Sequence, residues 1–380
     1  MKKLIAFTII SLLFILPVGA VENDIWPEQN PVLSLYDEQL RASGADDLMR
    51  SLPEDAADSL RRAGVSMDSP GSPPDLSNLL DIIIETTKHS AKAPMGVAAM
   101  LLGIIVLCAL LEGAKEAAGD KSLHGTASSA STLTVCLVAA VPIAAFITAT
   151  AETISGACNF AGVFVPVFAA VMAVSGQTAT AAGYSAFMMA VLEGCSAILA
   201  NIAVPLLKIF LAVSVTAATV PSFKIDSIVT AFEKNIKWIL AFFASLLVGA
   251  LGVSSMVASS ADQATARALK FAVTSGVPVV GSALGDAIGS VQGCVGLLRS
   301  TVGGFGIIAI AFIFIPPVIS CVLWRMCIGV CNFAAEAFGV KPVARLLKSI
   351  GAVLSILLSI LIFAAVVLII SSALVLKGTS

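Results

Sequence analysis

The sequence predicts an all-α fold: a polytopic transmembrane helix bundle of about seven to eight spans, preceded by a small helical extracytoplasmic region. Of 380 residues 58% are hydrophobic and only 12% are charged, and the mean hydropathy is +1.00. An average soluble domain has about 25% charged residues, so this chain has too few polar groups to cover a water-facing surface. Apolar runs near the 20 residues that cross a bilayer also recur along most of the chain.

Residues 1–20 are typical of a secretory signal peptide. Lys2 and Lys3 form the positive start, residues 4–16 are largely apolar, and small residues precede the expected cleavage point after Ala20. Thirteen helical residues measure about 20 Å, which is too short for a hydrocarbon core about 30 Å thick. We therefore expect cleavage, with an uncleaved anchor as the alternative.

We predict that residues 21–93 form an acidic extracytoplasmic helical region and a linker. They hold 14 Asp and Glu against 6 Lys and Arg, whereas residues 94–380 hold 10 against 14. A short helix is expected to start at Pro53 and to stop at Gly64. About 48 residues make a poor independent core, so this module should need a partner or the membrane surface. Residues 76–92 then predict an amphipathic helix lying along the outer surface of the membrane.

The multi-pass membrane domain is expected to cover residues 94–380. The predicted spans are 94–111, 131–150, 154–175, 184–201, 203–220, 237–258, 302–323 and 351–376. Residues 184–220 form either two spans hinged near Pro205 or one long broken helix, and the distribution of basic residues favours two. With the N-terminus outside, nine Lys and Arg fall in cytoplasmic loops and five in outer ones.

Residues 259–301 differ from an ordinary span. The amphipathic segment 261–271 carries Arg267 and Lys270 on one face, where they can meet lipid headgroups or an acidic partner, and Pro278 follows. We favour a pair of interfacial helices joined by a Pro-Gly turn. The alternative is a re-entrant or pore-lining segment. Its non-helical backbone would have to be covered by protein or by water.

A glycine repeat follows Pro278. Gly281, Gly285, Gly289 and Gly293 recur every fourth residue, so on a helix they form one smooth ridge that a neighbouring helix can approach closely. We predict that this ridge packs against another membrane subunit or a second copy of the chain.

Ionisable groups inside apolar runs are functional candidates, because each costs several kcal/mol unless it is paired or hydrated. Glu193 is expected either to hydrogen-bond a neighbouring helix or to line a hydrated pathway. Asp286 is either a turn acid or a pore group. Arg325 and Glu152 lie near predicted span ends, where their side chains can reach the interface.

No motif of catalysis or cofactor binding occurs in the sequence. P-loop, nucleophile-elbow and metalloprotease motifs are missing, and the eight cysteines lie mostly in apolar runs without neighbouring histidines. We expect a protein that is not an enzyme, has no cofactor or metal and binds no nucleic acid, with cysteines that pack as small apolar groups.

Several motifs carry a family resemblance. The most specific are Thr265-Ala266-Arg267-Ala268-Leu269-Lys270-Phe271, Val277-Pro278-Val279-Val280-Gly281 and Thr301-Val302-Gly303-Gly304-Phe305-Gly306, with weaker matches at Val165-Pro166, Val174-Ser175-Gly176 and Val204-Pro205-Leu206-Leu207. In these motifs the chain resembles the stage III sporulation protein AE family of endospore-forming Firmicutes. The likeness covers nearly the whole chain, although the first 90 residues match in character rather than in motif.

The resemblance implies a non-enzymatic membrane subunit of a secretion-like channel complex that connects mother cell and forespore and is required for sporulation. It implies a place in the mother-cell membrane, beside other stage III sporulation A-type membrane subunits, ring-forming subunits and a secretion-type ATPase. A homo-oligomer is also possible. The alternatives are an autonomous secondary transporter and a membrane scaffold without its own conduction path. The sequence does not show the two matching halves that are typical of a secondary transporter.

Single-cysteine labelling in a cysteine-free background tests the topology. Residues 21–92 should react with an impermeant reagent in intact cells, because a cleavable leader precedes them. Residues 112–130, 221–236 and 324–350 should react only after permeabilisation, because they hold most of the basic residues. Labelling of Arg345→Cys in intact cells would contradict this orientation.

Overall fold

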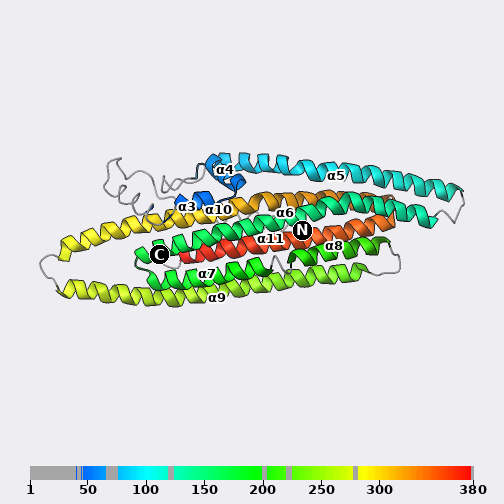
Figure 1. The fold of residues 1–380 in the computed structure, drawn as a ribbon. Coiled ribbons are helices and arrows are strands. Elements are labelled where there is room, and N and C mark those ends of the chain that lie inside the picture. The colour runs from blue at the N-terminus through cyan, green and yellow to red at the C-terminus, as the bar shows by residue number, and fades with distance from the viewer. Residues whose placement is uncertain are drawn as a thin grey trace.

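The protein is a long bundle of helices (Figure 1). The computed structural model describes residues 40, 44, 46–65, 76–118, 124–198, 203–219, 225–276 and 281–377. Regular structure in this part of the chain is entirely helical, which confirms the all-α prediction. The helices are α3 (Asp46–Ser51), α4 (Glu54–Arg62), α5 (Leu76–Ala118), α6 (His124–Val174), α7 (Thr178–Ile198), α8 (Val204–Thr219), α9 (Ile225–Gly276), α10 (Gly281–Ala337) and α11 (Lys341–Lys377).

Six helical segments are long and apolar enough to cross a membrane, by length and composition. They are Asn78–Leu111, Thr132–Val174, Thr178–Ile198, Ala231–Thr265, Leu298–Ala337 and Lys341–Ala373, and Val204–Val213 is a shorter apolar helix. These segments confirm a polytopic helical bundle. The signal peptide predicted at residues 1–20 lies outside the described residues.

The predicted spans 131–150 and 154–175 are one continuous helix, α6. The expected break at residues 151–153 is wrong, because a polar sequence inside a long helix need not interrupt it. Here the Thr153 hydroxyl donates to the Ala149 carbonyl at 3.0 Å, so its hydrogen-bond donor has a partner within the same helix. The chain reverses only at Ser175–Gln177. Gly176 has φ +82° there, and the Gln177 N–H donates to the Met172 carbonyl at 3.0 Å, as in a glycine C-cap.

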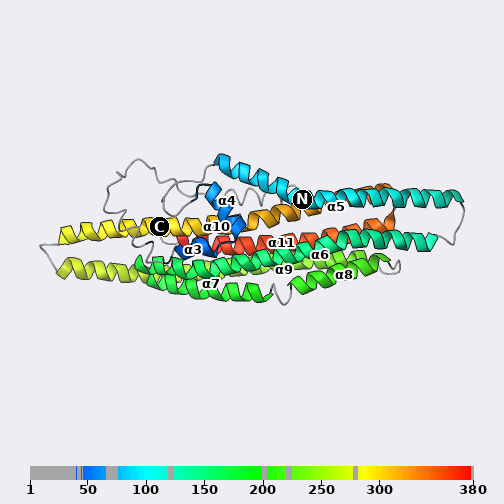
Figure 2. The same ribbon diagram turned by 45° about the horizontal axis from the view of Figure 1, so that its top comes forward.

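The segments α7 and α8 are separate helices, but they do not form two antiparallel spans. Figures 1 and 2 both show them end to end, so together they cross the length of the bundle once. The prediction of two spans in 184–220 is therefore wrong, and the alternative of one long broken helix describes the structure better.

The long helices run between two ends of the bundle, at which their turns are staggered (Figure 1). The last turns of α5, α8 and α10 and the first turns of α6, α9 and α11 lie at one end, and the start of α5 and the ends of α9 and α11 lie at the other. The described parts of the three loops predicted to be cytoplasmic therefore gather at the same end of the bundle.

The predicted amphipathic helix 76–92 and the first span form one helix, α5, with Pro94 inside it. A proline removes one backbone hydrogen bond and clashes with the preceding turn, which bends a helix without always ending it. Figure 2 shows α5 bent in the half nearer its start, where Pro94 lies. The prediction of a separate surface helix is therefore wrong.

Residues 259–301 are helical wherever they are described. The segment 261–271 is the last part of α9, and residues 281–301 begin α10. A helix pair is thus the better of the two predicted structures. Both views show the end of α9 and the start of α10 projecting beyond the other helices (Figures 1 and 2). Pro278, between them, lies outside the described residues.

The core is built around α11 and the contact between α6 and α10. In the most apolar 18-residue stretch of each helix, 67% of the residues are buried in α11 but only 11% in α9. Phe160, Phe164 and Phe168 of α6 form a stack with ring centroids 6.1 and 5.4 Å apart. Gly306 of α10 lies directly against Phe164, so that a Cβ there would overlap the ring. Gly306 thus allows α6 and α10 to approach closely.

The short helices α3 and α4 pack on the bundle itself. Leu48 and Leu60 are fully buried, α3 lies against α6, and α4 lies against α10 and the start of α5. Pro53 approaches α6 so closely that its Cγ lies 3.6 Å from where a Cβ on Gly156 would stand. Gly64 ends α4 with φ +71°, as predicted. The partner that this small module was expected to need is thus the rest of the same chain.

Gly306→Ala should destabilise the bundle by about 1–3 kcal/mol, because α6 and α10 must separate or Phe164 must leave its stack. Gly304→Ala is the matched control, since a Cβ there meets nothing within 4 Å. The thermal midpoint of the detergent-purified protein should fall for the first variant only. In a Phe164→Leu background the effect of Gly306→Ala should shrink. Equal midpoints for both glycine variants would show that the contact is not tight.

Candidate functional site

The predicted glycine ridge lies on the projecting start of α10. Gly281 opens the helix, and Gly285, Asp286 and Gly289 follow within its first three turns. Because the backbone is helical, glycines four residues apart lie along one side, so the geometric premise of the ridge is met. Arg267 is exposed on the facing end of α9, and Lys270 lies one turn further along α9. The projecting end formed by residues 267–276 of α9 and 281–289 of α10 is the tip of the bundle.

Glu193 lies on α7, away from the tip. Its side chain is on the exposed side of the helix. Residue 262 of α9 is level with residue 180 of α7, because their side chains hydrogen-bond. From that level Glu193 lies about 20 Å along the bundle in one direction and Arg267 about 7 Å in the other. The structure therefore does not bring Glu193 together with the other predicted site residues.

Asp262 of α9 forms a contact site that the sequence pattern does not reveal. Asp262 is 7% exposed, and its carboxylate accepts three hydrogen bonds from the first turn of α7. The donors are the backbone N–H groups of Ala179 and Thr180, both at 2.9 Å, and the Thr180 hydroxyl at 2.6 Å. A carboxylate there satisfies N–H groups that have no partner within the helix and opposes the positive end of the helix dipole. Asp262 thus clamps α9 to α7.

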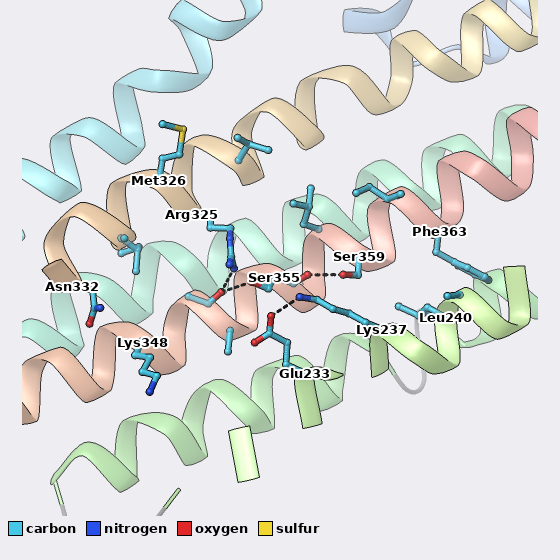
Figure 3. Close-up of a pocket in the computed structure, with 18 of the residues that line it drawn as sticks. Glu233, Lys237, Leu240, Arg325, Met326, Asn332, Lys348, Ser355, Ser359 and Phe363 are labelled. Atoms are coloured by element: carbon cyan, nitrogen blue, oxygen red, sulfur yellow. Dashed lines mark hydrogen bonds and ion pairs between the residues drawn. The ribbon is translucent and has the colours of Figure 1, made fainter. Parts of the chain in front are cut away.

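A groove between three helices is the second missed feature (Figure 3). It has a volume of about 810 Å³, with α9 and α10 as walls and α11 as floor. Its lining residues are Glu233, Lys237, Leu240, Ala241 and Ala244 of α9, Val322, Arg325, Met326, Ile328, Gly329 and Asn332 of α10, and Leu347, Lys348, Gly351, Ala352, Ser355, Leu358, Ser359, Ile362, Phe363 and Val366 of α11.

Polar side chains meet in the middle of this largely apolar groove. Lys237 and Glu233, one turn apart on α9, form an ion pair, with side chains 41% and 23% exposed. Arg325 reaches from α10 to α11, where its Nη1 donates to the Gly351 carbonyl at 2.8 Å. Figure 3 shows Lys237 and Arg325 both directed toward the same stretch of α11. Arg325 thus bonds the backbone of α11 across the groove.

The floor of the groove also carries hydroxyl groups bound to the helix backbone. The Ser355 hydroxyl donates to the Gly351 carbonyl at 2.9 Å, and that of Ser359 to the Ser355 carbonyl at 2.8 Å. Both hydroxyl oxygens keep lone pairs that can accept a further hydrogen bond. The groove can thus hold an apolar molecule that also carries a charged or polar group.

Two signals in the sequence pointed to parts of the groove. Glu233 and Lys237 have the spacing of a helical ion pair, and Gly351, Ser355 and Ser359 recur every fourth residue. Their meeting could not be predicted, because about 100 residues separate the two sets and neither pattern says which helices pack together.

The cysteines behave as expected of small buried groups. In the part of the chain that the structure describes, seven cysteines are free and most are buried. The Cys321 thiol donates to the Leu354 carbonyl at 3.4 Å and that of Cys331 to the Ala98 carbonyl at 3.6 Å. These weak hydrogen bonds join neighbouring helices. The second one shows which residues of α5 and α10 lie side by side.

The helices, their apolar lengths and a groove along their side define a polytopic helical membrane protein. Sequence comparison then gives its family: the model of Stage III sporulation protein AE matches residues 68–379, and the chain belongs to that family. This confirms the resemblance seen in the motifs and makes the chain a sporulation-related membrane protein.

A relative from Bacillus subtilis (strain 168), described as Stage III sporulation protein AE, is 24% identical over 223 residues. The match covers 58% of this chain and 56% of that protein, so it spans little more than half of the relative's length. No solved structure matches this chain.

Asp262→Asn should lower the free energy of unfolding by about 1.5–3 kcal/mol, because a neutral amide replaces the charged acceptor at the start of α7. Asp81→Asn is the matched control, since Asp81 is exposed on α5. Thermal melts of the two variants and of Thr180→Val, alone and combined with Asp262→Asn, measure the coupling. Strictly additive effects of Thr180→Val and Asp262→Asn would show that the hydroxyl bond contributes little, and equal melts of Asp262→Asn and Asp81→Asn would show the same for the whole clamp.

Proposed function

We propose that this protein is a non-enzymatic integral membrane subunit of a secretion-like channel complex that connects mother cell and forespore and is required for sporulation. The family match across residues 68–379 carries the proposal. Its partners are other stage III sporulation A-type membrane subunits, ring-forming subunits and a secretion-type ATPase, which supplies the energy. The protein lies in the mother-cell membrane with its N-terminal region outside the cytoplasm.

Two features of the structure support a role in assembly. The tip combines exposed Arg267 with the glycine positions of α10 and projects beyond the bundle, where other proteins can reach it. The groove opens on the side of the bundle rather than between two halves of a pseudo-symmetric carrier, where a secondary transporter holds its substrate. A subunit that serves mainly to dock others needs such lateral and terminal surfaces.

Affinity purification of the full-length tagged chain from sporulating cells tests this function. The other membrane subunits and the ATPase should co-purify, and deletion of the gene should block sporulation. Gly285→Leu and Gly289→Leu should lose partners and sporulation at normal protein level, because leucine side chains fill the ridge. Gly113→Leu on α5 is the control, since a Cβ there meets nothing within 4 Å.

Degradation of both ridge variants would instead show internal packing. Normal accumulation, full partner recovery and normal sporulation would remove the ridge as an interface. A wild-type chain that purifies alone and moves a solute across proteoliposomes would favour an autonomous transporter. Glu193→Gln should change assembly or flux without changing any chemical step, since Glu193 is given no catalytic role.

A further inference from the structure

The groove on α9, α10 and α11 has the length of a membrane-spanning helix. Its floor runs along α11 from Leu347 to Val366, which is about 29 Å of helix. The hydrocarbon core of a bilayer is about 30 Å thick. A phospholipid occupies one leaflet, or about half of that length, so it fills only part of the floor.

Small residues line the groove from all three sides. The floor presents Gly351, Ala352 and Ser355, while Ala241 and Ala244 face it from α9 and Gly329 from α10. Floor residues recur every third or fourth position, so they form one continuous face of α11. Surfaces of this kind let a helix backbone approach closely, whereas acyl chains gain nothing from them.

The charged groups of the groove are not balanced. Lys237, Arg325 and Lys348 carry three positive charges, and Glu233 carries one negative charge, so the lining has a net charge of +2. The Lys348 side chain is exposed, and Lys237 is already paired with Glu233. A lining with a net positive charge is complementary to an occupant that carries a carboxylate.

We propose that the groove docks one transmembrane helix of a partner subunit, with small residues on its contacting face and a carboxylate level with Lys237, Arg325 and Lys348. The inference rests on the proposed function, because it names the kind of partner that such a subunit holds. The partner's small residues pack on the floor at Gly351 and Ser355. Its carboxylate balances the excess charge and can accept hydrogen bonds from the cationic side chains.

A photoreactive phenylalanine analogue at Phe363 tests the proposal in membranes of sporulating cells with the full-length chain. Phe363 lines the groove. Phe243, which is 49% exposed on α9 outside the lining, is the control position. The adduct at Phe363 should map to an apolar helix of another membrane subunit that bears an acidic residue. The adduct should be absent at Phe243.

Three further variants make the test specific. Ala241→Leu should lower the adduct yield about tenfold, because its side chain fills the groove from the α9 wall. Ala250→Leu, also exposed on α9 but half a turn away in direction, should leave the yield unchanged. Lys348→Glu should also weaken the adduct, and exchanging the mapped partner carboxylate for lysine should restore it.

Adducts with phospholipid alone, with a second copy of this chain, or with nothing would overturn the proposal. So would an adduct that Ala241→Leu leaves unchanged. If the wild-type chain still co-purifies with its partners in those cases, the proposed function stands and only the groove assignment fails. If no partner co-purifies at all, the proposed function fails first.

Discussion

The length of the helices against the thickness of a bilayer constrains everything else in this structure. The 51 residues of α6 measure about 77 Å, and the 57 residues of α10 about 86 Å, whereas hydrocarbon is about 30 Å thick. Tilt accommodates only a fraction of that excess. A large part of each long helix must therefore find its partners in protein or water. The packing of α3 and α4 on α6 and α10 and the clamp from Asp262 to α7 provide such partners.

The same constraint explains where sequence patterns succeeded and failed. Composition and apolar runs predicted the helical class, the glycine-terminated turn at Gly64 and the helix pair around residues 259–301. They failed wherever a span was assumed to end once it had crossed 20 residues. Glu152 and Pro94 were taken as limits of spans, yet both lie inside continuous helices.

Two of these failures cancel in the topology. The absent break at residues 151–153 and the absent reversal between α7 and α8 each remove one change of direction, so α9, α10 and α11 keep the directions predicted for them. The predicted loop between spans 154–175 and 184–201, residues 176–183, holds no Lys or Arg. Placing this loop at the other end of the bundle therefore does not change the number of basic residues assigned to each end.

The groove and the tip are both formed in part by α9 and α10. Along α10, Arg325 in the groove and Gly285 at the tip are 40 residues apart, or about 60 Å along one helix that also contains Pro316 and Pro317. Along α9, Lys237 and Arg267 are 30 residues apart, or about 45 Å. The groove and the tip are thus joined by continuous helix, through which a partner seated in the groove can act on the direction of the tip. In the proposed assembly, docking within the membrane would therefore orient the projecting end for its own contacts. A short helix pair with a flexible joint could not couple the two.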